Sequence, residues 1–397
     1  MFINKFFTII IAIFKSKIVF KDPEQHKLVI FDDEGFDDLE HLIKDHDDYF
    51  ILQVRFYKIN KFYVSFNILK NLTKNYFRIK KNKKIFNAYL ITLIEMVKPK
   101  TVLTIIDNSI KFWELAKFFE ENINFVAIQN GSRNFEKKNY SEEKHKGFIP
   151  HFFCYGEYEI DYYKKWGFKV KNFYPSGSLR LANFFKFMEE KMINIENYSS
   201  DICLVAEEMN DYEKKFNDPN FSKNFVKVIK YAIQFCSNNN KKMIFALKRD
   251  IKRTPIHYEN EINFFKRHLN KEEFSYLMEN TIEKSKEEFT SYLSIYFSKV
   301  TLGTQSTLLR EKLSMGGKIL SCNLSKYSVF NFPIEGICTL NNCSYEEFEK
   351  RLIEILNISN KEYIAKLNRK HTYIMHYDPN YSIIESVKDK FLHLNDN

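Results

Sequence analysis

The turn at residues 303–307, Gly-Thr-Gln-Ser-Thr, has the residue types best suited to binding a phosphate. It follows the apolar run 298–302, predicted as a buried strand, and it opens a predicted helix at 308–315. Backbone N–H groups at a helix start bind phosphate, assisted by the helix dipole and by hydroxyl side chains, and a glycine lets the backbone approach closely. Glu311, about one turn into the helix, is placed to accept hydrogen bonds from ribose hydroxyls. A plain helix cap with a solvated glutamate fits the same residues, so the turn leaves both interpretations open.

Lys248 and Arg249 are the cations best placed to meet such a phosphate. They lie in the run 246–250, Ala-Leu-Lys-Arg-Asp, directly after a predicted strand at 242–247. Arginine offers a two-pronged donor to an anion and lysine a compact charge. A solvated basic turn is the alternative interpretation of this pair.

Carboxylates follow the first predicted strand, at 27–31. Asp32, Asp33 and Glu34 come at its end, and Gly35 permits a sharp turn there. A base that deprotonates a substrate hydroxyl belongs at such a position, and Glu157 is a second candidate. Each of these residues, like Glu207 and Glu208 later in the chain, also fits a helix cap or a solvated turn, and the pair Asp37-Asp38 is interpreted as surface charge.

Several chemistries lack their sequence signatures. The chain contains no HExxH motif, no convincing DxD, no Walker loop and no GxGxxG, so metal, ATP-hydrolysing and hydride-transfer chemistry are poorly supported. No two of the six cysteines form a CxxC pair, which is typical of a reduced, cytosolic protein. We therefore expect no metal and no cofactor.

The elements that must position these residues repeat along the chain. Short apolar runs bounded by turn residues alternate with helical patterns, first before residue 180 and again after residue 201. This alternation predicts parallel sheets covered by helices. With 397 residues the chain is long enough for two domains, joined near 181–200. The predicted fold class is α/β, with two Rossmann-like, doubly wound domains, at 21–190 and 191–377, facing each other across a cleft.

The two ends of the chain lie outside these domains. Residues 1–20 contain an apolar run flanked by lysines, too short to cross a bilayer. It fits a segment lying on the membrane, a first helix packed on the protein or, third, a cleaved signal. Residues 378–397 are predicted as a helix that crosses back to the first domain.

The net charge of +10 is spread along the whole chain and forms no arm or stripe. It suits anionic nucleotide substrates and an anionic membrane surface better than nucleic acid, for which the chain shows no binding signature. We expect a cytoplasmic protein, peripheral on the inner membrane, that binds no nucleic acid.

The run 298–320 resembles the donor-site segment of GT-B glycosyltransferases, in which a strand, a Ser/Gly-rich turn and a Glu-bearing helix precede a Gly-Lys and another strand. A basic residue after the second strand of the second domain commonly faces the donor diphosphate in that superfamily. Two features depart from the pattern, namely Lys312 in place of the usual alanine and the absence of a His-Pro. The resemblance implies donor-binding roles for the following residues: Lys248, Arg249, Gly303, Thr304, Ser306, Thr307 and Glu311.

The first half resembles bacterial proteins that synthesise surface carbohydrate, namely O-antigen, capsule or lipopolysaccharide. The likeness rests on the segments 128–133, 151–168 and 174–180. The residues that carry it are Gln129, Asn130, Gly131, Arg133, Gly156, Glu157, Gly177, Ser178 and Arg180. It implies that an acceptor binds near Asn130, Gly131, Arg133 and Arg180.

The resemblance implies a metal-independent glycosyltransferase that moves a sugar from a nucleotide sugar to a glycan or lipid-linked glycan. Asp32, Asp33, Glu34 and Glu157 are its candidate catalytic carboxylates. A sugar-nucleotide epimerase and a polyol-phosphate transferase share the fold and remain alternatives. A third alternative is a non-catalytic, membrane-associated assembly factor. The oligomeric state is left open.

Overall fold

The computed structural model describes residues 16–44, 46, 48–55, 59–79, 85–133, 147–207, 218, 221–377 and 382–392. Most of the N-terminal segment expected on the membrane, residues 1–15, lies outside the described residues. So do Glu208 and the parts of the predicted C-terminal helix at 378–381 and 393–397.

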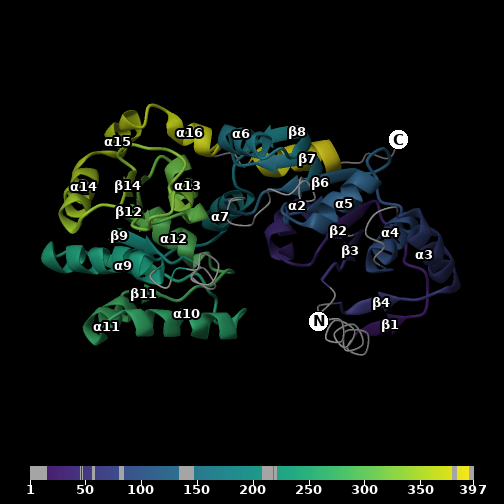
Figure 1. Ribbon diagram of the computed structural model, residues 1–397, viewed down its shortest axis with the longest axis horizontal. Coiled ribbons are helices and arrows are strands. Elements are labelled where there is room, and N and C mark those ends of the chain that lie inside the picture. The colour runs from purple at the N-terminus through teal and green to yellow at the C-terminus, as the bar shows by residue number, and fades with distance from the viewer. Residues whose placement is uncertain are drawn as a thin grey trace.

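Two six-stranded parallel sheets form the molecule, one in each half of the chain (Figure 1). The first has the order β3-β2-β5-β6-β7-β8. In the register, Leu28 of β2 is paired with Tyr49 on one side and with Thr101 on the other. The strands are β2 (Leu28–Phe31), β3 (Tyr49–Leu52), β5 (Thr101–Thr104), β6 (Asn124–Ile128), β7 (Phe148–Cys154) and β8 (Lys169–Pro175).

Both faces of the first sheet are buried, which explains why its strands appear in the sequence as continuous apolar runs. Val29 and Phe31 enter one core with α4 and α5, whereas Leu28 and Ile30 enter the opposite core. The helices of this half are η1 (Phe36–Leu39), α2 (Glu40–Ile43), α3 (Phe66–Arg78), α4 (Ile85–Val97), α5 (Ile110–Phe118), α6 (Glu157–Lys165) and α7 (Leu179–Glu190). A small parallel pair, β1 (Lys17–Val19) and β4 (Lys61–Tyr63), lies beside α3.

The second sheet has the order β11-β10-β9-β12-β13-β14. Its strands are β9 (Ser200–Val205), β10 (Met243–Ala246), β11 (Thr281–Ile282), β12 (Ser298–Gly303), β13 (Lys318–Asn323) and β14 (Thr339–Asn341). Its helices are η5 (Ile195–Asn197), α9 (Phe221–Asn238), α10 (Pro255–His268), α11 (Lys271–Glu279), α12 (Thr290–Phe297), α13 (Thr307–Ser314), η6 (Ser328–Phe330), α14 (Tyr345–Asn357) and α15 (Asn360–Lys366). Two parallel, helix-covered sheets confirm the predicted α/β fold class.

After the second sheet the chain returns to the first half (Figure 1). The returning elements are α16 (Lys370–Ile374), α17 (Ser382–Val387) and the π-helix η7 (Lys388–Leu392). Ile384 and Phe391 pack in the core that contains Leu28 and Leu103 of the first sheet. Thr101 Oγ1 donates a hydrogen bond of 3.0 Å to the Phe391 carbonyl oxygen.

Two glycines of the first half allow the returning segment to approach. A Cβ on Gly156 would lie 2.8 Å from the Tyr373 carbonyl oxygen, and one on Gly177 would lie 2.4 Å from the His376 carbonyl oxygen. Gly177 also has a φ of +81°, a conformation that favours glycine. The sequence spacing of these glycines therefore reflects contact with a segment about 200 residues further along the chain.

Candidate functional site

One cavity of about 1380 Å3 lies where the two halves face each other. In each sheet the strand order reverses once, between β2 and β5 in the first and between β9 and β12 in the second. Ligands of doubly wound folds bind outside the carboxyl ends of strands at such switch points. Gly35 and Asn108 from the first reversal, and Glu207 and Thr304 from the second, line the same cavity.

The turn after β12 forms part of the second-half wall. Glu207 Oε1 accepts hydrogen bonds from the backbone N–H groups of Thr304, at 3.0 Å, and Gln305, at 2.5 Å. The Thr304 hydroxyl donates to the Cys322 carbonyl oxygen at 3.1 Å, so it serves the sheet. A Cβ on Gly303 would lie 2.7 Å from Val205, because the strands pack closely there.

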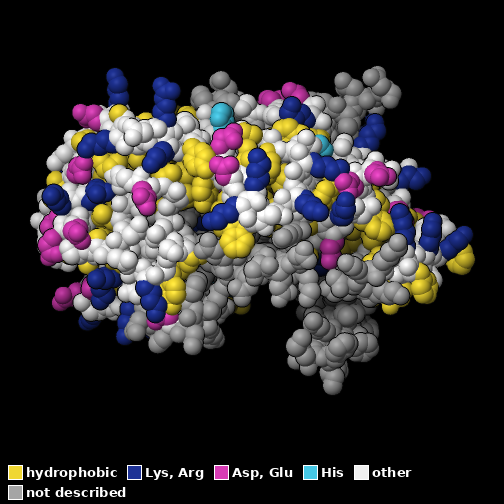
Figure 2. Space-filling view, turned by 45° about the horizontal axis from the view of Figure 1, so that its top comes forward, with side chains coloured by type: hydrophobic (Ala, Val, Ile, Leu, Met, Phe, Trp, Pro, Cys, Tyr) yellow, Lys and Arg dark blue, Asp and Glu magenta, His cyan; other side chains and the backbone are white. Residues whose placement is uncertain are grey.

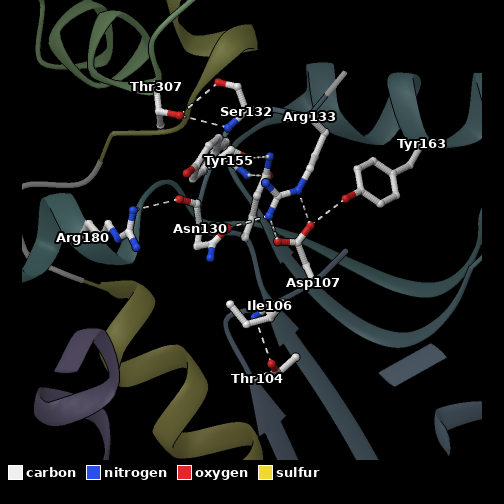
Figure 3. A network of polar contacts seen from close by, with 12 residues as sticks. Thr104, Ile106, Asp107, Asn130, Ser132, Arg133, Tyr155, Tyr163, Arg180 and Thr307 are labelled. Atoms are coloured by element: carbon white, nitrogen blue, oxygen red, sulfur yellow. Dashed lines mark hydrogen bonds and ion pairs between the residues drawn. The ribbon is translucent and has the colours of Figure 1, made fainter. Parts of the chain in front are cut away.

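The helix α13 begins at this turn. Ser306 caps it by accepting the Leu308 N–H at 3.4 Å. Thr307 Oγ1 accepts the Ser132 N–H of the first half at 3.0 Å, as Figure 3 shows. Of the predicted phosphate-binding residues in this turn, Thr304, Ser306 and Thr307 line the cavity.

Glu311 lies on α13 and is 1% exposed. Its Oε1 accepts hydrogen bonds from Ser178 Oγ at 2.5 Å and from Tyr292 at 2.8 Å, while Oε2 has no hydrogen-bond partner among the described residues. Burial raises the pKa of Glu311 to about 7, against the lowering effect of those two hydrogen bonds. These hydrogen bonds do not test whether Glu311 binds ribose hydroxyls, which stays a prediction.

Lys248 and Arg249 follow β10, as the sequence predicted, but only Lys248 of the two lines the cavity. Their backbone N–H groups are held by the carboxylate of Glu261, at 3.1 and 2.9 Å. Lys284, which the sequence analysis did not identify, lines the same wall. The pKa of Lys284 is lowered to about 8 by burial and then by the positive charges of Arg180 and Lys248. Arg180, Lys248 and Lys284 therefore line one cavity and are close enough for the charges of the first two to act on the third.

A polar network fixes the turn at 129–133 in the first half (Figure 3). The fully buried Asp107 accepts hydrogen bonds from Arg133 Nε and from Tyr163, each at 2.8 Å. Asn130 Oδ1 accepts from Arg133 at 2.6 Å, and its carbonyl oxygen accepts from Arg180 at 3.3 Å. Asn130, Arg133 and Arg180 line the cavity, so the structure brings three of the four predicted acceptor residues to it. Gly131 lies in the same turn, where a Cβ would meet Arg133 at 3.4 Å.

The interpretation of Asp37-Asp38 as surface charge is wrong for Asp38, which is 6% exposed. Its carboxylate pairs with Arg180 at 2.8 Å and with Lys286 of the second half at 3.0 Å. Asp37 pairs with Arg253 of the second half, and this pairing lowers the pKa of Asp37. The acidic pair therefore bridges the two halves at the cavity, a long-range contact that local spacing does not reveal.

The predicted carboxylates occupy different environments. Asp32, at φ +72°, is 4% exposed, and it accepts Arg55 Nε at 2.8 Å and the Glu34 N–H at 3.2 Å. Burial raises the pKa of Asp32. Asp33 accepts a hydrogen bond from Gln53 at 3.3 Å. Of the four candidates only Glu34 lines the cavity, and Glu157 is exposed at the start of α6.

Lys312 lies on α13, at a position where the family usually has alanine. Its side chain is buried, and Nζ donates to the carbonyl oxygens of Tyr296, at 3.1 Å, and Ser298, at 3.0 Å. Burial lowers the pKa of Lys312 to about 8. The lysine thus satisfies carbonyl groups at the end of α12, as cations commonly do at helix C-termini.

In the part of the chain that the structure describes, no group of three or more His, Cys, Asp or Glu side chains is arranged to hold a metal ion. No helix among the described residues combines the length and the apolar character needed to cross a bilayer.

Comparison with known proteins gives one family match. Residues 126–391 match a family model described as "putative O-antigen biosynthesis protein". No curated protein sequence matches the chain.

Solved structures share the fold. A variant of the wall teichoic acid polymerase TagF is similar with a TM-score of 0.53 at 10% identity, over 93% of this chain and 89% of that chain. The UDP-N-acetylglucosamine 2-epimerase of Rickettsia bellii gives 0.50 at 12% identity, over 93% and 100%. A Listeria monocytogenes protein described as "putative UDP-N-acetylglucosamine 2-epimerase" gives 0.50 at 12% identity, over 94% and 98%. At these identities the likeness concerns the fold, and it confirms the GT-B-type arrangement.

Proposed function

Because the chain belongs to the family of O-antigen biosynthesis proteins, we propose that it is a glycosyltransferase. It moves a sugar from a nucleotide-activated donor to a bacterial surface polysaccharide or lipopolysaccharide acceptor. The reaction needs no metal ion. The observation that carries the proposal is that Arg180, Lys248 and Lys284 line the same cavity as the first turn of α13.

The donor diphosphate lies against these cations in this proposal. Lys284 is half-buried, and its pKa is lowered first by loss of solvation and then by the charges of Arg180 and Lys248, which an anion bound there would offset. The helix dipole at the start of α13 adds to the same field. As the bond between sugar and phosphate breaks, the three cations stabilise the negative charge on the departing nucleoside diphosphate.

The nucleoside occupies the apolar part of the cavity. Leu247, Phe330 and Phe332 line the cavity next to Lys248 and the turn after β12. Flat apolar and aromatic surfaces bind a base by stacking. Glu311 lies nearby with one oxygen unpartnered among the described residues, which supports a hydrogen bond to a donor hydroxyl.

Glu34 is the base in this proposal. It lines the cavity on the first-half side, and Arg55 lies 3.5 Å from its carboxylate. Asp32 positions Glu34, because the Asp32 carboxylate accepts hydrogen bonds from both the Glu34 N–H and Arg55 Nε. Glu34 takes the proton of the acceptor hydroxyl, whose oxygen forms the new bond to the sugar.

A non-catalytic assembly factor is the second candidate, and one observation favours it. Glu207 occupies two N–H groups of the turn after β12, a position that an anionic ligand would otherwise reach. A chain of this kind would bind glycan or nucleotide without turnover.

A screen of nucleotides separates these candidates. We would measure binding of UDP, GDP, CMP, CDP, dTDP and their sugars by calorimetry, with wild type, Lys284→Met and the control Lys299→Met, which lies at an exposed ion pair with Asp201. We expect one nucleotide to bind wild type and the control, and to bind Lys284→Met at least tenfold more weakly. If no nucleotide binds, the transferase is rejected.

Product analysis then identifies the reaction. Conversion of the nucleotide sugar without an acceptor would indicate an epimerase, and transfer of a polyol phosphate from an activated polyol would indicate the other alternative. Transfer of sugar to a glycan acceptor supports the proposal, whereas binding without any product supports the assembly factor.

A further inference from the structure

The outer face of α3 exposes large apolar side chains to solvent. Phe66 is 81% exposed and Phe77 is 70% exposed, and a spacing of 11 residues places them on the same face of the helix. Ile68 and Asn75 lie on the opposite face and are buried. The helix therefore satisfies its packing against α4 with one side and presents aromatic rings on the other.

Lysines share this outer face. Lys70 and Lys74 are exposed one and two turns after Phe66. Figure 2 shows dark blue Lys and Arg side chains interspersed with yellow apolar ones at the right-hand end of the molecule, where Figure 1 places α3 and α4. The surface thus combines apolar rings with positive charge.

Both ends of α3 extend the apolar face. Asn67 donates a hydrogen bond of 2.7 Å to Asp22, which holds the chain after β1 against the start of α3. Phe20, in that segment, is 80% exposed. At the other end, Ile85 begins α4 and is 64% exposed. Exposed large apolar side chains therefore lie on α3 and near both of its ends.

We propose that the outer face of α3, with Phe20 and Ile85 at its ends, docks the protein on an anionic lipid bilayer. Water-exposed patches of large apolar side chains mark interaction surfaces. A face that combines aromatic rings with lysines matches the headgroup region of an anionic bilayer, where the rings enter the acyl boundary and the ammonium groups meet lipid phosphates. This surface belongs to the half that carries Glu34.

Vesicle flotation with the full chain tests the proposal. The vesicles contain phosphatidylcholine alone or phosphatidylcholine with phosphatidylglycerol, at low and high salt. We expect wild type to bind only the anionic vesicles, with affinity that falls as salt rises. The variant Phe66→Ser/Phe77→Ser should bind at least tenfold more weakly, and Lys70→Glu/Lys74→Glu should lose the preference for anionic vesicles.

The control Met192→Ser/Ile256→Ser removes two equally exposed apolar side chains elsewhere, at 103% and 72% exposure, and should bind like wild type. All four positions of the two serine variants are exposed, so unchanged thermal unfolding verifies that each variant is folded. Wild-type binding by Phe66→Ser/Phe77→Ser would overturn the proposal, because residues outside α3 would then account for the membrane contact. Equal binding to both kinds of vesicle, or binding to neither, would overturn it as well.

Discussion

Ser178 Oγ donates a hydrogen bond of 2.5 Å to Glu311 Oε1, joining the N-cap of α7 to α13 across the two halves of the molecule. The Ser132 N–H reaches Thr307 on the same helix at 3.0 Å. The first half therefore holds the helix whose first turn faces the cavity, so a change in the angle between the halves moves the proposed donor site. Binding at the cavity and the contact between the halves are coupled through α13.

Replacing Glu311 by glutamine changes how stability depends on pH. The pKa of Glu311 is raised from 4.5 to about 7 by burial, so the folded state holds more protons than the unfolded state between these values. Wild-type stability is then lost as pH rises from about 4.5 to about 7. Glu311→Gln has no carboxyl group to titrate at this position. The difference between its free energy of unfolding and that of wild type should therefore rise by up to about 3 kcal/mol as pH rises from about 4.5 to about 7. Urea denaturation at pH 5 and pH 8 measures this, and parallel pH profiles would contradict it.

Lys284 makes nucleotide affinity pH-dependent. Its pKa of about 8 means that raising the pH from 7 to 9 removes its charge, so nucleotide binding should weaken severalfold over that interval. Binding of a diphosphate raises the pKa of Lys284, and protons should be taken up at pH 8. Calorimetry in two buffers of different ionisation enthalpy detects this uptake. Lys284→Met should bind weakly at every pH and take up no protons, and an uptake that persists in the variant would assign it to another group.

The candidate site was predictable where chemistry follows a strand directly. Lys248, the turn before α13 and Glu34 each come at the carboxyl end of an apolar run, and all three reach the cavity. Lys284 lies between a two-residue strand and α12, in a stretch without an apolar run, and nothing local marked it. The Asp38 bridge is set by how the two halves face each other, which spacing along the chain does not encode.

Glu34 and Asp32 should respond differently to loss of charge. If Glu34 is the base, Glu34→Gln should lower kcat at least a hundredfold with little change in nucleotide Kd. Asp32→Asn should lower kcat less, because Asp32 acts through Arg55 and the Glu34 N–H. In kcat against pH, the acidic limb should shift in Asp32→Asn and vanish in Glu34→Gln. Near wild-type turnover by Glu34→Gln would move the role of base to another residue.

The bridge between the halves depends more on Asp38 than on Asp37. Asp38 is buried and pairs with both Arg180 and Lys286. Asp38→Asn removes the carboxylate that pairs with Arg180 and one of the two that pair with Lys286, and it should cost about 3 kcal/mol. Asp37 is half exposed, and the loss of its ion pair with Arg253 should cost less than about 1 kcal/mol. Denaturant unfolding measures both variants, and small-angle scattering should show a wider Asp38→Asn molecule. Equal losses of unfolding free energy in the Asp38 and Asp37 variants would mean that Asp38 contributes no more than a surface ion pair does.

The fold class could be predicted from the sequence more fully than the contacts between segments that are distant in the sequence. Buried parallel strands such as β2 and β5 carry four consecutive buried residues each, and this gives them a clear sequence signal. The strands β1, β4 and β11 have only two or three residues, with partly or fully exposed side chains, and were not predicted as strands. The departure at Lys312 was visible in the sequence, but its role at the end of α12 required the packing of α12 on α13.

Alanine variants at Gly177 and Gly316 distinguish the cost of a steric clash from the cost of backbone strain. Both have positive φ, +81° and +75°, so alanine at either position carries a strain of about 1–2 kcal/mol. A Cβ at Gly316 meets nothing within 4 Å, whereas at Gly177 it would lie 2.4 Å from the His376 carbonyl oxygen of the returning segment. Gly177→Ala should therefore cost at least about 2 kcal/mol more than Gly316→Ala, and it should expose the segment near His376 to proteolysis. Thermal unfolding and limited proteolysis compare the two variants. Equal stability and equal cleavage would show that the returning segment adapts to a side chain at Gly177, and that its packing on the first half does not depend on this glycine.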